Sequence, residues 1–206
     1  LLPRRNRLAR RSAVAMPGAH AFEQVIAANV DQVVPVFAAA APPPRWNMLD
    51  RYLVSAESLD LPSLVVITKL DLAEDTGSLA AEVDTYRQAG YPVMLSSTVS
   101  GEGIDAIKQA LQGKTSVLVG KSGVGKTSLL NALQPGLGLR VGEVSSYNGK
   151  GRHTTSQAVM YELEFGGTIV DTPGVREFGL WDVNEDDLAL FFPEMRPYVG
   201  RCKFGL

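Results

Sequence analysis

The sequence is poor in the residues that build disulfide-linked or metal-rich proteins. Its 206 residues include one cysteine, Cys202, and two histidines, His20 and His153. A single cysteine excludes a disulfide within the chain and gives no indication of an oxidising compartment. A tetrahedral zinc site needs four ligands, so Cys202 alone cannot supply one.

Long apolar stretches are also missing. No run approaches the roughly 20 residues that a membrane-spanning helix needs, and the beginning of the chain lacks the pattern of a signal peptide. We therefore expect no membrane partner. We also expect a cytoplasmic protein and a monomer, although the sequence itself gives no oligomeric state. The chain begins at Leu1 without a methionine and stops four residues after Cys202, so we expect a piece of a longer protein.

The chain does contain enough apolar sequence for a folded core, with 45% hydrophobic and 20% charged residues. Its net charge of −2 hides an asymmetry. Residues 1–11 hold five arginines and no acid, whereas the remainder has 15 basic and 22 acidic residues, a balance of −7. A basic arm on an acidic body could contact nucleic acid, and a solvated linker explains the charge equally well.

Short apolar runs rich in β-branched residues alternate with helical patterns. The expected strands are Val33–Phe37, Leu64–Thr68, Pro92–Leu95, Ser116–Val119, Ala158–Leu163 and Thr168–Val170. The expected helices are Trp46–Leu59, Ser78–Ala89, Ile104–Leu111 and Lys126–Leu133. This alternation predicts an α/β fold with a doubly wound, mostly parallel sheet covered by helices on both faces.

Four residues refine these elements. Pro35 cannot donate to a sheet ladder, so it suggests the margin of a strand or an edge strand. Ser78 is a plausible N-cap for the second helix, and Gly90 followed by Pro92 should end that helix.

One glycine-rich stretch matches the phosphate loop of P-loop nucleotide hydrolases. The pattern is Gly, four residues and then Gly-Lys-Ser/Thr, between a strand and a helix, and residues 120–127 (GKSGVGKT) fulfil it. A second GKTS string, at 113–116, lacks the first glycine and leads into a strand, so we reject it. The expected nucleotide-binding residues here are Gly120, Lys121, Ser122, Gly123, Val124, Gly125, Lys126, Thr127 and Ser128.

The chemistry of such a loop explains its residues. Backbone N–H groups and the helix N-terminus hold phosphate oxygens. Lys126 is expected to contact the β- and γ-phosphates as a catalytic residue, and the Thr127 hydroxyl is expected to bind magnesium.

The stretch Thr68-Lys69-Leu70-Asp71 closes an apolar strand and resembles the Asn-Lys-x-Asp guanine-recognition motif of GTPases. The Asp71 carboxylate could accept from both N1–H and the 2-amino group of guanine, a pair that adenine does not offer. Ser96-Ser97, at the end of the next strand, resembles the loop whose backbone contacts guanine O6. Thr68 replaces the usual Asn and removes an amide that holds the loops together. We therefore expect weaker nucleotide affinity with the guanine preference retained.

Two further stretches resemble the GTPase switches. Asp171-Thr172-Pro173-Gly174 follows a strand, with Asp171 expected to hold magnesium through water and the Gly174 N–H to contact the γ-phosphate. Residues 149–155 (GKGRHTT) are similar to the first switch, with Thr154 or Thr155 expected to contact magnesium.

The order of these motifs is unusual, because the guanine-recognition motif precedes the phosphate loop. Such an order indicates a circularly permuted GTPase domain. The chain resembles the ribosome small subunit-dependent GTPases, the RsgA or YjeQ family. The stretches that carry this resemblance are Leu2–Asn6, Ala28–Val33, Leu49–Leu53, Gly123–Lys126, Gly151–Thr155 and Asp171–Phe178. The resemblance implies a protein that binds GTP or GDP with magnesium, contacts the immature small (30S) ribosomal subunit and its rRNA, and hydrolyses GTP late in subunit maturation.

The same resemblance implies the domain organisation. Residues 1–15 would be an arginine-rich remnant leading from an oligonucleotide-binding domain, 16–180 the permuted GTPase domain, and 181–206 the start of a zinc-binding domain. Cys202 would be a zinc ligand only if the chain continued, so zinc is not assigned to these residues.

Val175 stands where many GTPases place a glutamine that orients the attacking water. His153, in the first switch, is the candidate to take or relay a proton, and a solvent-facing loop residue is the alternative interpretation. Three hypotheses remain: a ribosome-stimulated GTPase, a nucleotide-dependent binding switch with negligible hydrolysis, and an ATPase, which Asp71 disfavours.

Overall fold

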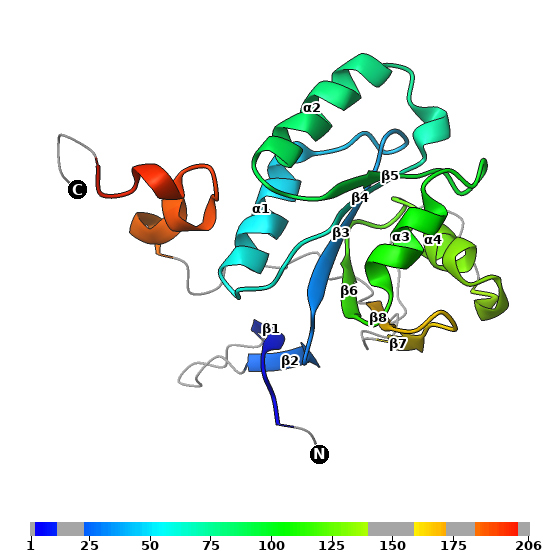
Figure 1. Ribbon diagram of the computed structural model, residues 1–206, viewed down its shortest axis with the longest axis horizontal. Coiled ribbons are helices and arrows are strands. Elements are labelled where there is room, and N and C mark those ends of the chain that lie inside the picture. Colours follow the sequence, from blue (N-terminus) through cyan, green and yellow to red (C-terminus); the bar gives the residue numbers. More distant parts are fainter. Residues whose placement is uncertain (1–2, 12–22, 140–158, 172–183, 202–206) are drawn as a thin grey trace, which may run out of the picture.

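The computed structural model describes residues 3–11, 23–139, 159–171 and 184–201 (Figure 1). Its centre is a six-stranded sheet in the spatial order β5 (Val93–Leu95), β4 (Val65–Thr68), β3 (Gln32–Ala38), β6 (Thr115–Val119), β8 (Thr168–Asp171) and β7 (Val159–Glu162). All neighbours pair in parallel except β7, which lies antiparallel to β8 at one edge. The predicted α/β fold with a mostly parallel sheet is confirmed.

Helices cover both faces of this sheet. The helices α1 (Trp46–Glu57) and α2 (Thr76–Gln88) share one core cluster, and α3 (Ile104–Leu111) and α4 (Lys126–Leu133) share the other. Alternate residues of a strand point to opposite faces, so in β3 Val33 and Phe37 belong to the first cluster and Val34 and Val36 to the second. This is why β3 is buried at every position and, after Gln32, is apolar throughout instead of alternating.

The predicted helices and strands all occur, with ends shifted by two residues or fewer. Four 3₁₀-helices add to them: η1 (Leu70–Leu72), η2 (Pro135–Leu137), η3 (Glu185–Phe191) and η4 (Arg196–Tyr198). In the described part of the chain, the helices are too short and too polar to span a membrane.

The prediction for Pro35 was wrong, because β3 lies in the interior of the sheet between β4 and β6. Towards β4, Val33 N donates to Pro62 O and Ala39 N to Thr68 O. The backbone N–H groups of every second residue in a strand point to the same neighbouring strand, so the position where Pro35 lacks an N–H also faces β4. Between β3 and β4 the pairing consists of one bridge at Val33 and a ladder that begins at Val36. The sheet thus tolerates the proline by interrupting one ladder, while Pro35 keeps its register with β6.

The N-cap prediction for α2 was also wrong. Asp75 is the N-cap, and its carboxylate accepts from Ser78 N at 2.9 Å. Aspartate and serine are both good N-caps. Asp75 takes this position because it stands three residues before Ser78, whose backbone N–H lies in the first turn of the helix and needs an acceptor. The helix ends at Gln88, before Gly90 with φ of +99°, as predicted.

Two strands were not expected. β1 (Arg7–Arg11) pairs antiparallel with β2 (Glu23–Ala28) in a small separate sheet. Leu8 of β1 is fully buried in the cluster shared by α1 and α2. The arginine-rich composition of this arm concealed an apolar residue that anchors it.

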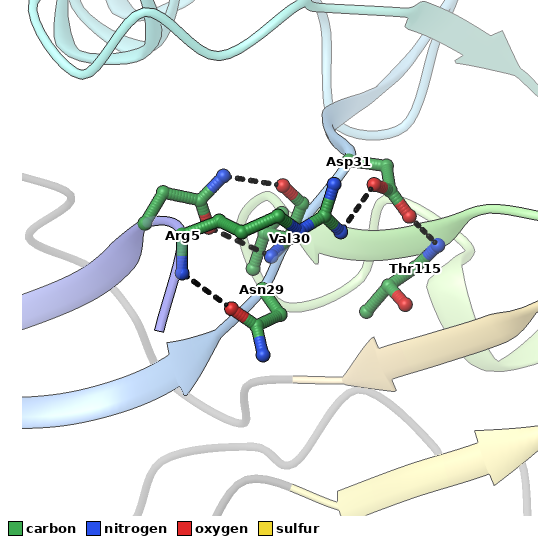
Figure 2. Close-up of polar contacts among 6 residues, drawn as sticks. Arg5, Asn29, Val30, Asp31 and Thr115 are labelled. Atoms are coloured by element: carbon green, nitrogen blue, oxygen red, sulfur yellow. Dashed lines mark hydrogen bonds and ion pairs between the residues drawn. The ribbon is translucent and has the colours of Figure 1, made fainter. Parts of the chain in front are cut away.

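The arm is also held by polar contacts at the start of β3 (Figure 2). The Asn6 side chain accepts from Val30 N and donates to Val30 O, at 2.8 and 2.7 Å. Arg5 forms an ion pair of 3.0 Å with Asp31, whose second carboxylate oxygen accepts from Thr115 N at 2.8 Å. Asp31 therefore connects the arm, β3 and β6.

The segment 184–201 lies beside α1 (Figure 1). The Arg196 guanidinium pairs with the Glu57 carboxylate at the end of α1. Phe192 and Glu194 line a cavity of about 250 Å³ together with residues of α1 and α2. The boundary predicted at residue 181 falls outside the described residues.

Candidate functional site

The phosphate loop connects the carboxyl end of β6 to α4, as predicted. Glycine is required at two of its positions. Gly120 has φ of +152°, and a Cβ there would lie 2.4 Å from Val36 O. Gly125 has φ of +93°, and a Cβ there would lie 3.2 Å from Thr68 Oγ1. The loop therefore fits closely against β3 and against Thr68 of the predicted guanine-recognition motif.

Lys126 begins α4 and folds back over this loop. Its ammonium group donates to Gly120 O at 2.7 Å and to Lys121 O at 2.9 Å. Burial lowers the pKa of Lys126, and the nearby negative charge of Asp171 opposes this shift. The cation is thus held inside the loop by backbone carbonyls, in the place where a phosphate would need it.

Thr68 joins the two halves of the candidate site. It ends β4, is 2% exposed, and its hydroxyl lies 2.5 Å from Val124 O in the phosphate loop and 3.1 Å from Phe37 O. A threonine in this position therefore still connects the loops, through a hydroxyl instead of an amide. The weaker affinity expected from Thr68 stays a prediction.

Lys69 makes a second connection. It adopts a left-handed backbone conformation with φ of +56°, and its ammonium group donates to Gly123 O at 2.7 Å and to Ala41 O. Its side chain therefore extends along the phosphate loop towards the segment that follows β3.

Asp71 is held by the Ser96–Ser97 loop. The Ser97 hydroxyl lies 2.5 Å from Asp71 Oδ1 and accepts from Val99 N and Ser100 N. Because the two amides occupy the hydroxyl oxygen, its single proton is directed to the carboxylate. Leu70 N donates to Ser96 O at 3.1 Å, which fixes the two loops side by side.

These contacts bring the predicted residues to one edge of the sheet. Asp71 contacts the Ser96–Ser97 loop, and Thr68 and Lys69 contact the phosphate loop that holds Lys126. The carboxyl ends of parallel strands meet at the same edge, and ligands of open α/β sheets bind there. The arrangement can therefore present a carboxylate and a phosphate cradle to a single nucleotide.

Oxygen donors for magnesium are present at the same edge. Thr127 lies in the first turn of α4, and Asp171 ends β8, where it pairs with Leu118 of β6. A hydroxyl and a carboxylate beside a phosphate loop fit a small hard cation such as magnesium. Among the described residues, no group of three or more His, Cys, Asp and Glu side chains could hold a metal ion.

Some predicted residues lie outside the described part of the chain. They are His153, Thr154, Thr155, Gly174 and Cys202. Their roles in proton transfer, magnesium binding, γ-phosphate contact and zinc binding stay predictions.

Two supporting residues were missed by the sequence analysis. A Cβ at Gly103, where φ is +75°, would lie 2.0 Å from Leu95 O and 3.3 Å from Ser96 Cα, so this glycine supports the serine loop. Its signal in the sequence is a glycine immediately before a helix. Ala41, whose carbonyl accepts from Lys69, left no signal, because any residue offers a backbone carbonyl.

The sequence is similar to proteins of known families. The profile of the RsgA GTPase family matches residues 1–181. The chain is 48% identical over 203 residues to the small ribosomal subunit biogenesis GTPase RsgA of Gemmatimonas aurantiaca, covering 98% of this chain and 64% of the relative. It is 43% identical over 199 residues to the protein of the same name from Pseudomonas aeruginosa, covering 96% and 58%. The chain thus spans about three fifths of the length of these relatives.

Solved structures show the same similarity. YjeQ from Thermotoga maritima superposes with a TM-score of 0.70 at 34% identity, over 94% of this chain and 60% of YjeQ. YloQ, described as a circularly permuted GTPase, superposes with a TM-score of 0.66 at 31% identity, over 92% and 64%. The order of motifs inferred from the sequence agrees with a permuted fold.

Proposed function

We infer the function from one premise: the chain belongs to the RsgA GTPase family. We propose that the protein binds GTP and GDP with magnesium, hydrolyses GTP, and acts in late maturation of the small ribosomal subunit, in contact with that subunit and its rRNA. We further propose that residues 16–180 are the GTPase domain, that it is monomeric, and that it works in the cytoplasm. One observation carries the nucleotide site: Thr68 and Lys69 contact Val124 and Gly123 of the phosphate loop.

Each described residue has a role in this proposal. Asp71, oriented by the Ser97 hydroxyl, accepts from the N1–H and 2-amino groups of guanine. Lys69 lays its methylene stem over the base. The phosphate-loop amides and the N-terminus of α4 hold the phosphate oxygens. Lys126 exchanges its carbonyl partners for phosphate oxygens when nucleotide enters.

Magnesium, held by Thr127 and through water by Asp171, would neutralise charge on the phosphates. His153 is proposed to take or relay the proton of the attacking water, since Val175 cannot orient it. Thr154 or Thr155 would complete the magnesium site, and the Gly174 N–H would contact the γ-phosphate.

The alternative is a nucleotide-dependent binding switch with negligible hydrolysis, which the presence of Val175 favours. GTP turnover by the whole protein, measured with and without purified small ribosomal subunits, separates the two. Stimulation by subunits supports the GTPase. Normal nucleotide binding without stimulated turnover supports the switch.

The guanine assignment has its own test. Asp71→Asn should shift preference from guanine towards xanthine nucleotides, because an amide N–H can donate to the 2-oxo group of xanthine. Competition of GTP and XTP against a fluorescent GTP analogue measures this shift. Asp105→Asn, an exposed carboxylate on α3, is the matched control. Unchanged selectivity in Asp71→Asn would remove Asp71 from base recognition.

The phosphate loop is tested separately. Lys126→Ala should abolish nucleotide binding, since it removes the cation held at the loop, whereas Lys108→Ala on the surface of α3 should not. Titration with a fluorescent GTP analogue gives both affinities. Normal affinity of the Lys126 variant would refute the assignment of this loop.

A further inference from the structure

A groove lies beside the guanine-recognition loop and outside the nucleotide site itself. It has a volume of about 620 Å³ and is lined on one side by the segment after β3, including Pro43 and Trp46. Its other side is formed by the turn before α2 and the first turns of that helix, including Leu72 and Leu79. Leu72 is 48% exposed, so its side chain is available to a ligand in the groove.

The rim of this groove carries charge of one sign. Glu74, Asp75 and Glu82 line it, and no lysine or arginine does, although Arg45 lies next to the lining residues in the chain. Asp75 caps α2 through one carboxylate oxygen, and Glu74 is exposed. An apolar floor with an acidic rim suits a ligand that has apolar side chains and positive charges, and it repels nucleic acid phosphates.

Both sides of the groove continue directly into the candidate nucleotide site. Leu72 follows Asp71 in the chain, so one side begins where the guanine-recognition motif ends. The other side is tied to the same motif, because Ala39 N donates to Thr68 O and the Lys69 ammonium donates to Ala41 O. A ligand in the groove would therefore contact segments that Thr68, Lys69 and Asp71 hold in place.

We propose that this groove binds a cationic, leucine-containing peptide segment of a partner protein, and that its occupancy is coupled to guanine-nucleotide binding. The binding of the peptide stands on the groove alone, whereas the coupling rests on the proposed function. Nucleotide that engages Lys69 and Asp71 fixes both sides of the groove, so nucleotide should tighten peptide binding. By linkage, the peptide must then tighten nucleotide binding by the same factor.

The test uses a labelled heptapeptide of alternating arginine and leucine, with a glutamate–leucine heptapeptide as its control. Fluorescence anisotropy with the purified protein should detect binding of the first peptide only. Glu74→Lys should weaken that binding about fivefold, because it reverses a charge at the rim. Leu72→Ser should weaken it through the apolar floor, and rising salt should weaken it through screening.

Glu162→Lys makes the same charge change at an exposed residue of β7, the edge strand at the end of the sheet far from β4 and β5. It should leave peptide affinity unchanged. Equal losses in this control, or unchanged affinity in both groove variants, would overturn the proposal. Labelled oligouridylate is the nucleic-acid test: binding of RNA that Leu72→Ser weakens and Glu74→Lys strengthens would show that the groove serves RNA instead.

The coupling is measured with saturating GDP in the peptide titration and with saturating peptide in a titration of fluorescent GDP. Equal factors of at least twofold support it, and factors of one in both directions refute it. A protein that binds no guanine nucleotide would refute the proposed function, while the titrations without nucleotide would still decide whether the groove binds the peptide.

Discussion

At the scale of single residues, Thr68 connects the end of β4 to the phosphate loop. Its hydroxyl has one proton and two carbonyl neighbours, Val124 O and Phe37 O. One proton cannot serve both fully, so the shorter contact, to the phosphate loop, is the one it makes. An asparagine side chain at this position would offer two N–H donors and would be longer than that of threonine.

Thr68→Val keeps the shape of the side chain and removes the donor. The buried carbonyls of Val124 and Phe37 then lose a partner, so the free energy of unfolding should fall by about 1–3 kcal/mol. Affinity for a fluorescent GTP analogue should fall as well, because the phosphate loop is no longer tied to the guanine motif. Denaturant unfolding and nucleotide titration measure these effects.

Thr68→Ser retains the hydroxyl and serves as the control for this substitution. It should keep most of the nucleotide affinity. A valine variant that binds nucleotide as tightly as the wild type would mean that the hydroxyl does not hold the loops.

The residues that carry side-chain chemistry at this site were predictable from the sequence. Asp71 and Lys126 stand in motifs whose spacing follows from the ligand they are predicted to bind, and both motifs follow the carboxyl ends of parallel strands of one sheet. The contacts that position them were not predictable, because Ala41 and Gly123 act through backbone carbonyls. Only the path of the chain shows which carbonyls face Lys69.

At the scale of elements, the site depends on how α3 begins. Gly103 stands at its N-cap with φ of +75°, against Leu95 O at the end of β5 and the backbone of Ser96. The helix can approach this strand so closely only because residue 103 has no side chain. The position of the Ser96–Ser97 loop, and through it that of Asp71, therefore depends on the start of a helix that contributes no ligand.

Gly103→Ala should force these elements apart. Its Cβ would lie 2.0 Å from Leu95 O, a backbone atom that cannot rotate away, and its positive φ adds strain. We expect a loss of about 2–4 kcal/mol in the free energy of unfolding and a loss of guanine affinity in the fraction that folds. Thermal unfolding and nucleotide titration are the measurements.

Gly101→Ala is a matched control, because Gly101 has φ of +81° but a Cβ there would meet nothing within 4 Å. It should cost about 1 kcal/mol from backbone strain alone. Equal destabilisation by the two alanines would mean that the contact with Leu95 does not matter.

Helices and strands whose apolar residues recur at a regular spacing were predictable from the sequence. Elements held mainly by contacts with distant parts of the chain were not. α3 and α4 match their predicted bounds because a glycine precedes each helix and apolar residues follow at helical spacing. β1 was missed because its composition is dominated by arginine, whereas Leu8, which is buried in the core, anchors it. The prediction for Pro35 was wrong because the absence of a backbone N–H at a proline does not show which neighbouring strand that N–H would have faced.

At the scale of the whole molecule, Asp31 connects the small sheet to the large one. Its carboxylate accepts from Thr115 N at the start of β6 and pairs with Arg5 of the arm (Figure 2). The hydrogen bond from Thr115 is the largest cause that lowers the pKa of Asp31, and the charge of Arg5 lowers it further against the effect of burial. The arm is thereby attached to the strand that leads into the phosphate loop.

This lowered pKa predicts how stability depends on pH. A carboxyl group whose folded pKa lies below its unfolded value of about 3.8 stabilises the protein above that value, and the contribution is lost as the pH falls through the folded pKa. Asp31→Asn should therefore lower the free energy of unfolding by about 1 kcal/mol near neutral pH. The difference between wild type and variant should vanish in strong acid.

Denaturant unfolding between pH 7 and pH 2 measures this difference. Asp105→Asn, at a carboxylate that is 92% exposed, should show no comparable change with pH. A constant difference between wild type and the Asp31 variant at every pH would mean that the charge of Asp31 is not what stabilises this junction.

The interruption at Pro35 has a consequence for movement. The residues predicted to bind guanine follow β4 and β5, those predicted to bind phosphate and magnesium follow β6 and β8, and β3 lies between the two pairs of strands. On one side of β3, pairing with β6 is continuous over Gln32–Pro35. On the other side, pairing with β4 is interrupted at Pro35. Any sliding of one half of the candidate site against the other would begin at that gap, and the Thr68 hydroxyl and the Lys69 ammonium group would still join the end of β4 to the phosphate loop.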